Sequence, residues 1–343
     1  MGSVKELLIE SGPANMVLGR GNFVFSNDYS VFDWGKMPDK ILFKGRVLCM
    51  LGAFNFELLE REGIQTHYLG VMEDGKIKRF REATEPSNEM KVMVVRKPEL
   101  GFKNGEYCYD QYRKQAGKNF LVPLEVIFRN SVPVGSSFRK RFKPKDIGLK
   151  GGKWPRENVK LKKPIIDFST KLETKDRYLS EKEAMKISML SEELFDELKK
   201  IAVKVNKTIT KQAKKQKMVH EDGKIELFCF KDELFVADVA GTFDENRFSF
   251  KGKEISKEVI RQYYKKTDPA WVKSVDNAKK TANRKNSSNW KGFCKRQPQP
   301  LPLELLKLVG EMYTAGANTY IGKEIFEARD LGTVLDEIYS WGE

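Results

Sequence analysis

The stretch IELFCFKDELFVADV, residues 225–239, carries the clearest signal for the fold of this chain. Two apolar runs flank the polar residues 231–233, and this pattern predicts a β-hairpin. Glu226 and Asp238 lie on its two strands among apolar neighbours. A carboxylate in a buried strand is costly unless it is paired or binds a metal, and two on adjacent strands could coordinate Mg²⁺ carried by nucleotide phosphates. The alternative is that both carboxylates face solvent.

Strands are predicted upstream of this hairpin. The first 35 residues alternate short apolar runs with turn residues, which indicates antiparallel strands joined by tight turns. The same reasoning predicts further elements, namely strands over 67–72, 91–96 and 122–129, a helix over 44–62 and a long Lys/Gly/Pro-rich loop over 138–163.

Helical patterns dominate the remaining sequence. Ser180 and Glu183 form a capping-box pattern ahead of one helix, and apolar residues keep helical spacing through a second, long helix from 194 to 209. Further helices are expected over 256–266, near 303–313 and near 323–341. Strands come first and mixed helices and hairpins follow without regular βαβ alternation, which predicts an α+β fold rather than a doubly wound sheet.

The length of 343 residues predicts two domains, or one large domain with insertions. We expect an N-terminal antiparallel β domain over 1–120, an α+β domain over 121–296 and a C-terminal helical extension over 297–343. The extension begins with the stiff spacer QPQPLP. It is expected to be a terminal cap, or an arm packed on the body or on a neighbouring subunit of a homo-oligomer.

The net charge of +15 comes from 63 Lys and Arg against 48 Asp and Glu. Residues 138–163 carry a net +9 and residues 273–296 a net +7, so the rest of the chain sums to −1. Such stretches suggest anionic partners: nucleic acid, a membrane surface or small phosphorylated ligands. The alternative is solvated loop charge without a partner.

Several chemistries are disfavoured by the patterns present. His67 and His220 belong to no Ser-His-Asp or HExxH pattern, so neither a hydrolase triad nor a zincin is expected. No GxxxxGK[ST] loop and no apolar run long enough to span a bilayer occur. The cysteines form no CxxC pair, which argues against a zinc site or a disulfide framework and favours a reducing cytoplasm; they are Cys49, Cys108, Cys229 and Cys294.

A turn flanked by arginines lies at 129–141. Arg129 ends a predicted strand, Gly135 and Ser136 fall in the turn, and three basic residues follow. Backbone N–H groups and hydroxyls between arginines make a phosphate or carboxylate cradle, whereas the alternative is a surface turn beside a basic loop. Asp33, between aromatic residues near a predicted strand end, is a further candidate.

Together these segments resemble the SAICAR synthetase family (phosphoribosylaminoimidazole-succinocarboxamide synthase) of purine biosynthesis. DYSVFDWGKMPDKI at 28–41 is similar to the family's D-R-x-S-A-F-D segment. PLEVIFRNSVPVGSSFRKR at 123–141 is similar to its P-x-E-x-V-x-R-x…G-S segment. Residues 225–248 are similar to the family's E-F…D-E-x-S-P-D-x-x-R segment. The three segments follow one another in the family's order.

The resemblance implies an ADP-forming carbon–nitrogen ligase with ATP between the N-terminal antiparallel-sheet domain and the larger C-terminal domain. The family activates the carboxylate of CAIR (carboxyaminoimidazole ribonucleotide) as an acyl phosphate, which L-aspartate attacks to give SAICAR. By position, the resemblance assigns catalysis to Asp238, Glu226 and Arg247. It assigns Mg²⁺ to Glu226 and Asp238, CAIR to Asp33, Arg129, Ser136 and Arg247, and ATP to Gly12, Asn15, Lys97 and Glu226.

One departure concerns the ATP phosphates. The family's G-K-x-K turn is replaced by residues 12–15, GPAN, so Arg20 and Lys91 are candidates to supply the missing cations. Two alternatives stay open: a non-catalytic basic protein that binds RNA or DNA, and another kinase-like phosphotransferase. The carboxylate pair and Arg247 favour the ligase, with ATP, CAIR and L-aspartate as partners and neither nucleic acid nor membrane. The basic stretches would then act as a funnel and lid for small anions.

Overall fold

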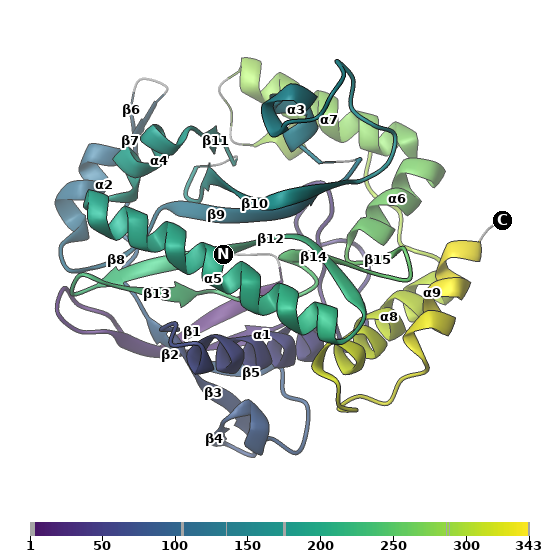
Figure 1. Cartoon of the computed structure of the whole chain (residues 1–343), viewed down its shortest axis with the longest axis horizontal. Coiled ribbons are helices and arrows are strands. Elements are labelled where there is room, and N and C mark those ends of the chain that lie inside the picture. The colour runs from purple at the N-terminus through teal and green to yellow at the C-terminus, as the bar shows by residue number, and fades with distance from the viewer. Residues whose placement is uncertain are drawn as a thin grey trace.

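The computed structural model of the chain describes residues 4–341 except 104–105, 135, 174–175, 286 and 288, and it does not describe the side chain of Asn283. Within this part, helices pack on the outside of two large antiparallel sheets, and one small hairpin projects at the edge of the molecule (Figure 1). The α+β prediction is confirmed.

The first sheet has the strand order β1-β2-β5-β3-β4. Its strands are β1 (Lys5–Ser11), β2 (Gly19–Phe25), β3 (Tyr68–Glu73), β4 (Lys76–Lys78) and β5 (Glu89–Val94). Helix α1 (Lys44–Arg61) covers it, because Val47, Leu51 and other apolar residues recur at helical spacing and are fully buried. The antiparallel strands and this helix are confirmed.

The second sheet is organised around β12 (Met218–Phe230), which pairs with strands on both of its edges. The main order is β11-β10-β9-β12-β14-β15, and β8 and β13 also pair with β12. The other strands are β8 (Asn119–Leu121), β9 (Leu124–Val132), β10 (Val159–Thr170), β11 (Tyr178–Leu179), β13 (Glu233–Ala237), β14 (Asn246–Phe250) and β15 (Lys253–Ile255). The predicted hairpin is confirmed as β12–β13.

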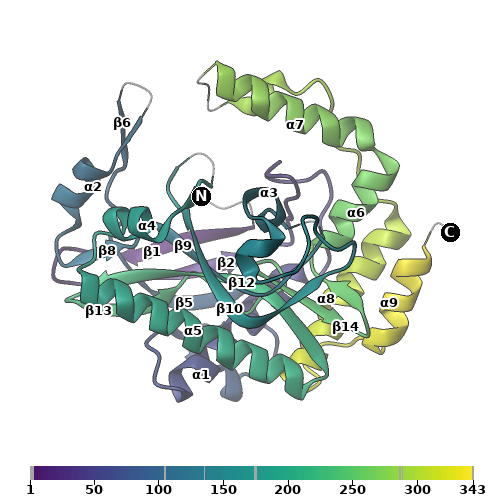
Figure 2. The same ribbon diagram turned by 45° about the horizontal axis from the view of Figure 1, so that its top comes forward.

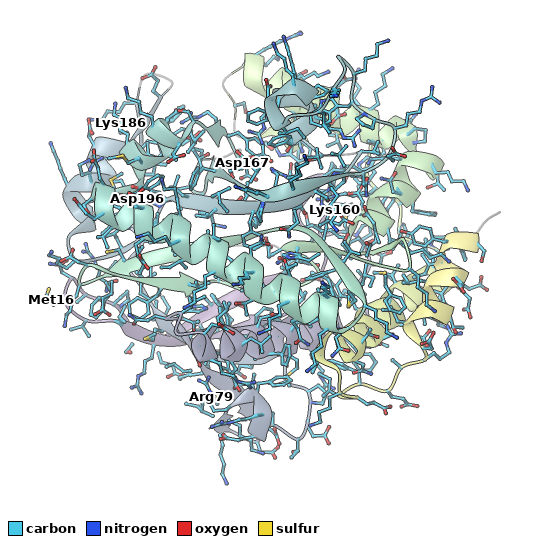
Figure 3. All side chains as sticks on the ribbon, viewed as in Figure 1. Met16, Arg79, Lys160, Asp167, Lys186 and Asp196 are labelled. Carbon is cyan, nitrogen blue, oxygen red and sulfur yellow. The ribbon has the colours of Figure 1, made fainter. Side chains whose placement is uncertain are left out.

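The prediction of one long loop over 138–163 is wrong. The segment holds α3 (Phe138–Arg141) and the short helix η2 (Pro144–Ile147), and its end starts β10. Lysines hide this strand in the sequence, because its first half is largely exposed and the pairing with β9 is irregular between Lys160 and Ile165. Lys160 and Asp167 lie toward opposite ends of β10 (Figure 3).

The helices of the second half surround the larger sheet (Figure 2). They are α4 (Glu181–Ser188), α5 (Glu192–Lys215), α6 (Glu258–Thr267), α7 (Pro269–Arg284), α8 (Leu303–Ile321) and α9 (Leu331–Ser340). Ser180 and Ser191 cap α4 and α5 by accepting backbone N–H groups three residues on. The remaining elements are β6 (Gly101–Lys103), β7 (Glu106–Cys108), α2 (Tyr109–Ala116), η1 (Phe80–Glu82) and η3 (Trp290–Phe293).

The C-terminal extension packs on the body. Helix α8 lies against α1, and its Val309, Met312 and Tyr320 are fully buried. Both predicted helix lengths need correction: α8 continues to Ile321, because buried residues keep helical spacing beyond 313, and α9 begins only at Leu331, where Asp330 caps it. Among the described residues, no helix combines the length and apolar character needed to cross a bilayer.

Candidate active site

A polar cavity of about 510 Å³ lies between the central strands of the second sheet and the start of α6. Four residues predicted from the sequence line it together: Asp33, Arg129, Ser136 and Arg247. Carboxylates outnumber cations in its wall, and the charged lining residues are Asp33, Glu125, Arg129, Asp176, Asp222, Lys224, Asp244, Glu245, Arg247, Lys257, Glu258 and Arg261. An anion that entered this cavity would therefore meet two arginines amid acidic groups.

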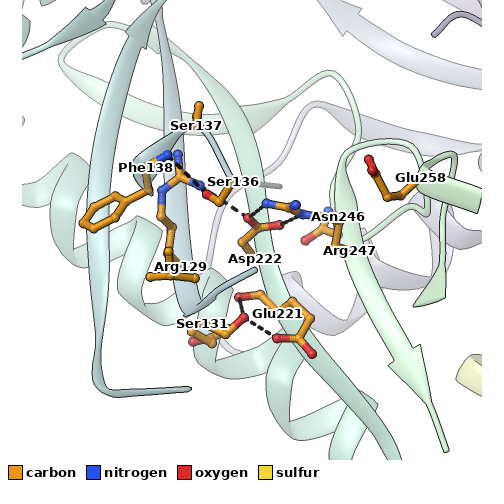
Figure 4. Close-up of polar contacts among 12 residues, drawn as sticks. Arg129, Ser131, Ser136, Ser137, Phe138, Glu221, Asp222, Asn246, Arg247 and Glu258 are labelled. Carbon is orange, nitrogen blue, oxygen red and sulfur yellow. Dashed lines mark hydrogen bonds and ion pairs between the residues drawn. The ribbon is translucent and has the colours of Figure 1, made fainter. Parts of the chain in front are cut away.

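Strand register brings two arginines to one carboxylate. Asp222 on β12 lies opposite Arg129 on β9 and opposite Arg247 on β14. Arg247 Nε donates to Asp222 Oδ1 at 2.8 Å, and Arg129 Nη1 donates to Oδ2 at 3.4 Å (Figure 4). Burial works against the charge of Arg247, but the Asp222 carboxylate outweighs it and raises the pKa of the guanidinium. Asp222 therefore holds two cations at the cavity wall.

Ser136 lies where β9 leads into α3. Its side chain is buried, and its hydroxyl accepts the Phe138 backbone N–H at 3.3 Å. The Phe138 ring lies 5.6 Å from the Arg129 guanidinium, so the turn after β9 also orients that arginine. Gly135, which the sequence placed in this cradle, lies outside the described residues.

Asp33 reaches the same cavity from the first third of the chain. Phe32 and Asp33 both adopt left-handed backbone angles, with φ of 54° and 60°, which non-glycine residues adopt at a cost. Lys279 of α7 donates to Asp33 Oδ2 at 2.6 Å and to the Phe32 carbonyl at 2.8 Å. The Asp33 side chain stays exposed, and although the surrounding protein partly desolvates it and so raises its pKa, Lys279 and more distant cations outweigh this effect and lower the pKa. Helix α7 is thereby tied to the loop that carries Asp33.

The structure places Glu226 and Asp238 close to each other. Glu226 pairs in register with Ala237, the residue before Asp238. Lys171 Nζ lies 2.5 Å from Glu226 Oε1. Burial and the nearby Asp238 charge raise the pKa of Glu226 to about 7, although Lys171 opposes them. Two carboxylates that disfavour each other's charge form a site where a cation is stabilised.

Asp238 itself has an unusual backbone. Its φ of 65° lies in the left-handed region, which costs free energy for a non-glycine residue. Lys5 Nζ on β1 lies 2.5 Å from Asp238 Oδ1. Burial raises the pKa of Asp238, but Lys5 and Lys171 outweigh it and lower the pKa. The contact with Lys5 joins the first sheet to the carboxylate pair.

The donor set fits Mg²⁺ bound together with nucleotide phosphates. Among the described residues, no group of three or more His, Cys, Asp and Glu side chains could hold a metal by itself. Mg²⁺ is ordinarily held by one or two carboxylates plus phosphates and waters, rather than by a cage of protein ligands. Glu226 and Asp238 are two such carboxylates, and their mutual effect on pKa is what a divalent cation would relieve.

Lysines connect this pair to the polar cavity. Lys224 donates to Glu125 at 2.7 Å, and Lys171 lies 3.6 Å from the same carboxylate while also contacting Glu226. The sequence argument missed both lysines. A signal was available for Lys224, because Asp222, Lys224 and Glu226 alternate on one face of β12. Lys171 and Lys5 carry no comparable local pattern.

The three residues assigned only to ATP do not line the polar cavity. Gly12 follows β1 in open space, and a Cβ atom built there would meet no atom within 4 Å. Asn15 Oδ1 accepts the Lys118 backbone N–H at 2.7 Å, so this amide oxygen is already used within the protein. Lys97 is exposed after β5.

The two proposed substitute cations differ in their surroundings. Lys91 is buried on β5 and pairs with Glu10. Arg20 is exposed on β2, and its backbone N–H donates to the Ser11 hydroxyl. Neither residue lines the polar cavity, whereas Lys5 directly contacts the Asp238 carboxylate.

Comparison with known proteins gives a consistent result. The family model described as SAICAR synthetase matches residues 18–278. An Archaeoglobus fulgidus protein, provisionally named phosphoribosylaminoimidazole-succinocarboxamide synthase, is 46% identical, and the alignment covers 98% of each chain.

Solved structures share the fold. A SAICAR synthase of Saccharomyces cerevisiae in complex with SAICAR has a TM-score of 0.60 and 19% identity, over 93% of this chain and 96% of that chain. A type-2 SAICAR synthetase in complex with ADP has a TM-score of 0.56 and 22% identity, over 88% of this chain and 99% of that one.

Proposed function

The chain belongs to the SAICAR synthetase family, and we propose that its polar cavity is where L-aspartate is joined to CAIR at the expense of ATP. The reaction is an ADP-forming carbon–nitrogen ligation of purine biosynthesis. The observation that carries the assignment to this cavity is the Arg129–Asp222–Arg247 arrangement across three strands, with Ser136 beside it.

We assign the anionic groups of CAIR to this arrangement. Arg129, Arg247 and the Ser136 hydroxyl bind its phosphate or carboxylate, and Asp33 lies beside the imidazole ring. Guanidinium groups suit this task because they form paired charge-assisted hydrogen bonds with phosphate or carboxylate oxygens. Asp222 keeps both guanidinium groups oriented before the substrate arrives, which lowers the entropic cost of binding.

We assign the ATP phosphates to the neighbourhood of Glu226 and Asp238. These carboxylates would hold Mg²⁺, which neutralises phosphate charge and lets a carboxylate approach the terminal phosphate. The ADP complex of the structural relative supports a nucleotide site in this fold. Lys5 takes the place of the lysines absent from residues 12–15, because its Nζ already lies against Asp238. Gly12, Asn15 and Lys97 stay proposals for contacts to other parts of the nucleotide.

The ligation proceeds in two steps. The CAIR carboxylate attacks the terminal phosphorus of ATP and ADP leaves; the amine of L-aspartate then attacks the acyl carbon, phosphate leaves and the amine loses a proton. Water must be excluded in between, because an acyl phosphate hydrolyses. Helix α7 is suited to cover the cavity, since Lys279 ties it to Asp33.

The domain division, cellular location, oligomeric state and partners follow from the same proposal. We keep the division at 1–120, 121–296 and 297–343 as a functional description, with the nucleotide between the first two parts. Cytoplasmic residence suits the four free cysteines. A homo-oligomer stays a proposal. The nucleic-acid alternative is not favoured, because Arg139 and Arg141 of the first basic stretch bind groups of the protein itself.

The direct test is ADP release with Mg·ATP, CAIR and L-aspartate together and with each one omitted. We expect ADP release to require CAIR and to continue over many turnovers only when L-aspartate is also present. SAICAR should then form in an amount equal to the ADP released. Steady ADP release that never needs L-aspartate would contradict the ligase. ADP release that needs neither CAIR nor L-aspartate would instead indicate another phosphotransferase.

A further inference from the structure

A second cavity, of about 460 Å³, adjoins helix α6. Its wall is formed by α6, α8, α9 and the strand β15. Small-molecule sites commonly have volumes of this size and a mostly apolar wall with a few polar groups. The apolar wall here comprises Val259, Tyr263, Leu305, Ile338, Tyr339 and Trp341.

One carboxylate oxygen in the wall of this cavity lacks a hydrogen-bond donor among the described residues. Glu254 Oε2 on β15 is buried and accepts no hydrogen bond from the described residues. Burial raises the pKa of Glu254, and the nearby Glu258 charge raises it further, although the charge of Arg247 opposes both. A buried carboxylate oxygen without a donor costs free energy, so its presence calls for a donor supplied from outside the protein.

The other charged groups in the wall are Glu258 and Lys266. The Glu258 carboxylate is already satisfied, because Arg261 and Lys265 each approach it to 3.2 Å and Gln262 donates to it at 2.6 Å. Glu254 is therefore the group with unused acceptor capacity.

We propose that this cavity binds a small organic cation, an ammonium or guanidinium group carried on an aromatic or alkyl body. The cation would donate to Glu254, while its body packs against the Tyr263, Tyr339 and Trp341 side chains. Aromatic faces attract cations, and hydrogen bonds between ions are stronger than neutral ones. A neutral apolar ligand would leave the Glu254 oxygen unsatisfied.

This ligand differs in charge from the substrates of the proposed reaction. ATP, CAIR and L-aspartate are anions, and the Glu254 carboxylate would repel them. The two cavities share Glu258, which lines both, but the remaining lining residues differ. The second cavity is thus a separate site whose occupancy does not depend on the ligase assignment.

Tryptamine and tryptophol make a matched pair of probes, because both carry an indole ring on a two-carbon chain and only tryptamine has an ammonium group. Calorimetric titration would measure their affinities for the full chain and for its Glu254→Gln variant. Glu324→Gln, an exposed residue between α8 and α9, is the control.

We expect tryptamine to bind the wild-type chain at least about tenfold more tightly than tryptophol, and Glu254→Gln to weaken it by about tenfold or more. Glu324→Gln should leave its affinity unchanged, and saturating CAIR should not displace it. Equal affinity for the two probes, absent binding of tryptamine, an unaltered Glu254→Gln variant or full displacement by CAIR would each overturn the proposal. If Glu254→Gln does not fold, Trp341→Leu decides: unchanged tryptamine affinity there overturns it too.

Discussion

Lys44 Nζ and Asp244 Oδ2 lie 2.7 Å apart although 200 positions separate the two residues in the chain. The Lys44 side chain is fully buried at the start of α1, and the Tyr313 hydroxyl of α8 donates to the other Asp244 oxygen at 2.8 Å. Burial raises the pKa of Asp244, but Lys44 outweighs it and lowers the pKa. Since Asp244 also lines the polar cavity, this ion pair and the Tyr313 hydroxyl join three distant segments beside the proposed active site.

Replacing Lys44 by Met should destabilise the protein strongly. The substitution leaves the Asp244 charge buried without its counterion, which typically costs about 3–5 kcal/mol. Urea unfolding would measure the free energy of unfolding, and Lys40→Met, at an exposed position nearby, should change it by less than about 0.5 kcal/mol. A Lys44→Met variant as stable as the wild type would show that the ion pair does not hold these segments together.

Asp238→Asn should abolish turnover while the fold stays intact. Asparagine keeps the size of the side chain and tolerates the left-handed backbone, but it removes the charge that would bind Mg²⁺. ADP release and the melting temperature would be measured side by side. Asp232→Asn, in the exposed turn of the same hairpin, is the control and should retain activity. If Asp238→Asn turned over at the wild-type rate, Asp238 would not bind Mg²⁺ in the reaction.

Arg247→Gln should raise KM for CAIR much more than KM for ATP. A hydrogen bond to a charged group contributes about 1.5–3 kcal/mol, which corresponds to a KM increase of roughly 10- to 150-fold. Steady-state kinetics with each substrate varied would show the difference. Arg329→Gln removes an arginine that pairs with carboxylates at the surface, and it should leave both constants unchanged. An equal rise in both constants would contradict a specific contact with CAIR.

His220 should make the protein less stable in acid. Burial lowers its pKa from 6.5 to about 4, while Asn246 opposes this effect. Below pH 6.5 the unfolded chain therefore takes up a proton that the folded chain takes up only near pH 4. The stabilisation that His220 provides is present above pH 6.5 and is lost toward pH 4, by about 2 kcal/mol between pH 7 and pH 5.

Urea unfolding at pH 7 and pH 5 would measure that loss. His220→Gln should lose less stability than the wild type over this range, by about the same 2 kcal/mol. His67, whose pKa burial also lowers to about 4, remains in the variant and contributes its own loss in both proteins. Parallel pH profiles for the variant and the wild type would show that His220 takes up its proton over the same pH range in the folded and unfolded states, which would contradict the lowered pKa.

Three exposed lysines offer a test of the electrostatic funnel. Arg139 and Arg141 are engaged within the protein, so Lys143, Lys145 and Lys150 are the better sites for neutralisation. Replacing all three by Gln should raise KM for ATP or CAIR at low ionic strength and lose this effect at high salt, because exposed charges are screened. If KM does not change at low salt, the lysines of this stretch are solvated surface charge that does not attract substrates.

The control for that experiment carries the same number of substitutions elsewhere. Lys207, Lys211 and Lys214 are exposed on α5, which does not line the polar cavity. Replacing them by Gln changes the net charge by the same amount. An equal rise in KM in both triple variants would attribute the effect to net charge rather than to the basic stretch.

Local sequence patterns determined much of this protein. Two apolar runs on either side of a polar turn predicted the β12–β13 hairpin and hence the nearness of Glu226 to Asp238, and apolar residues at helical spacing predicted α1 and α5. These features depend on residues close in the chain, where side-chain periodicity directly reflects which face is buried. Where lysines masked that periodicity, as at the start of β10, the prediction of a loop was wrong.

Only the tertiary structure decided how the site is assembled. Asp222 meets Arg129 and Arg247 because β12 pairs with β9 and β14 in one register, and Lys5 meets Asp238 because the two sheets pack together. Strand register and ion pairs between distant segments result from burial and pairing over the whole molecule, so no local pattern reveals them. The sequence thus identified the candidate site residues, and packing decided which charges they face.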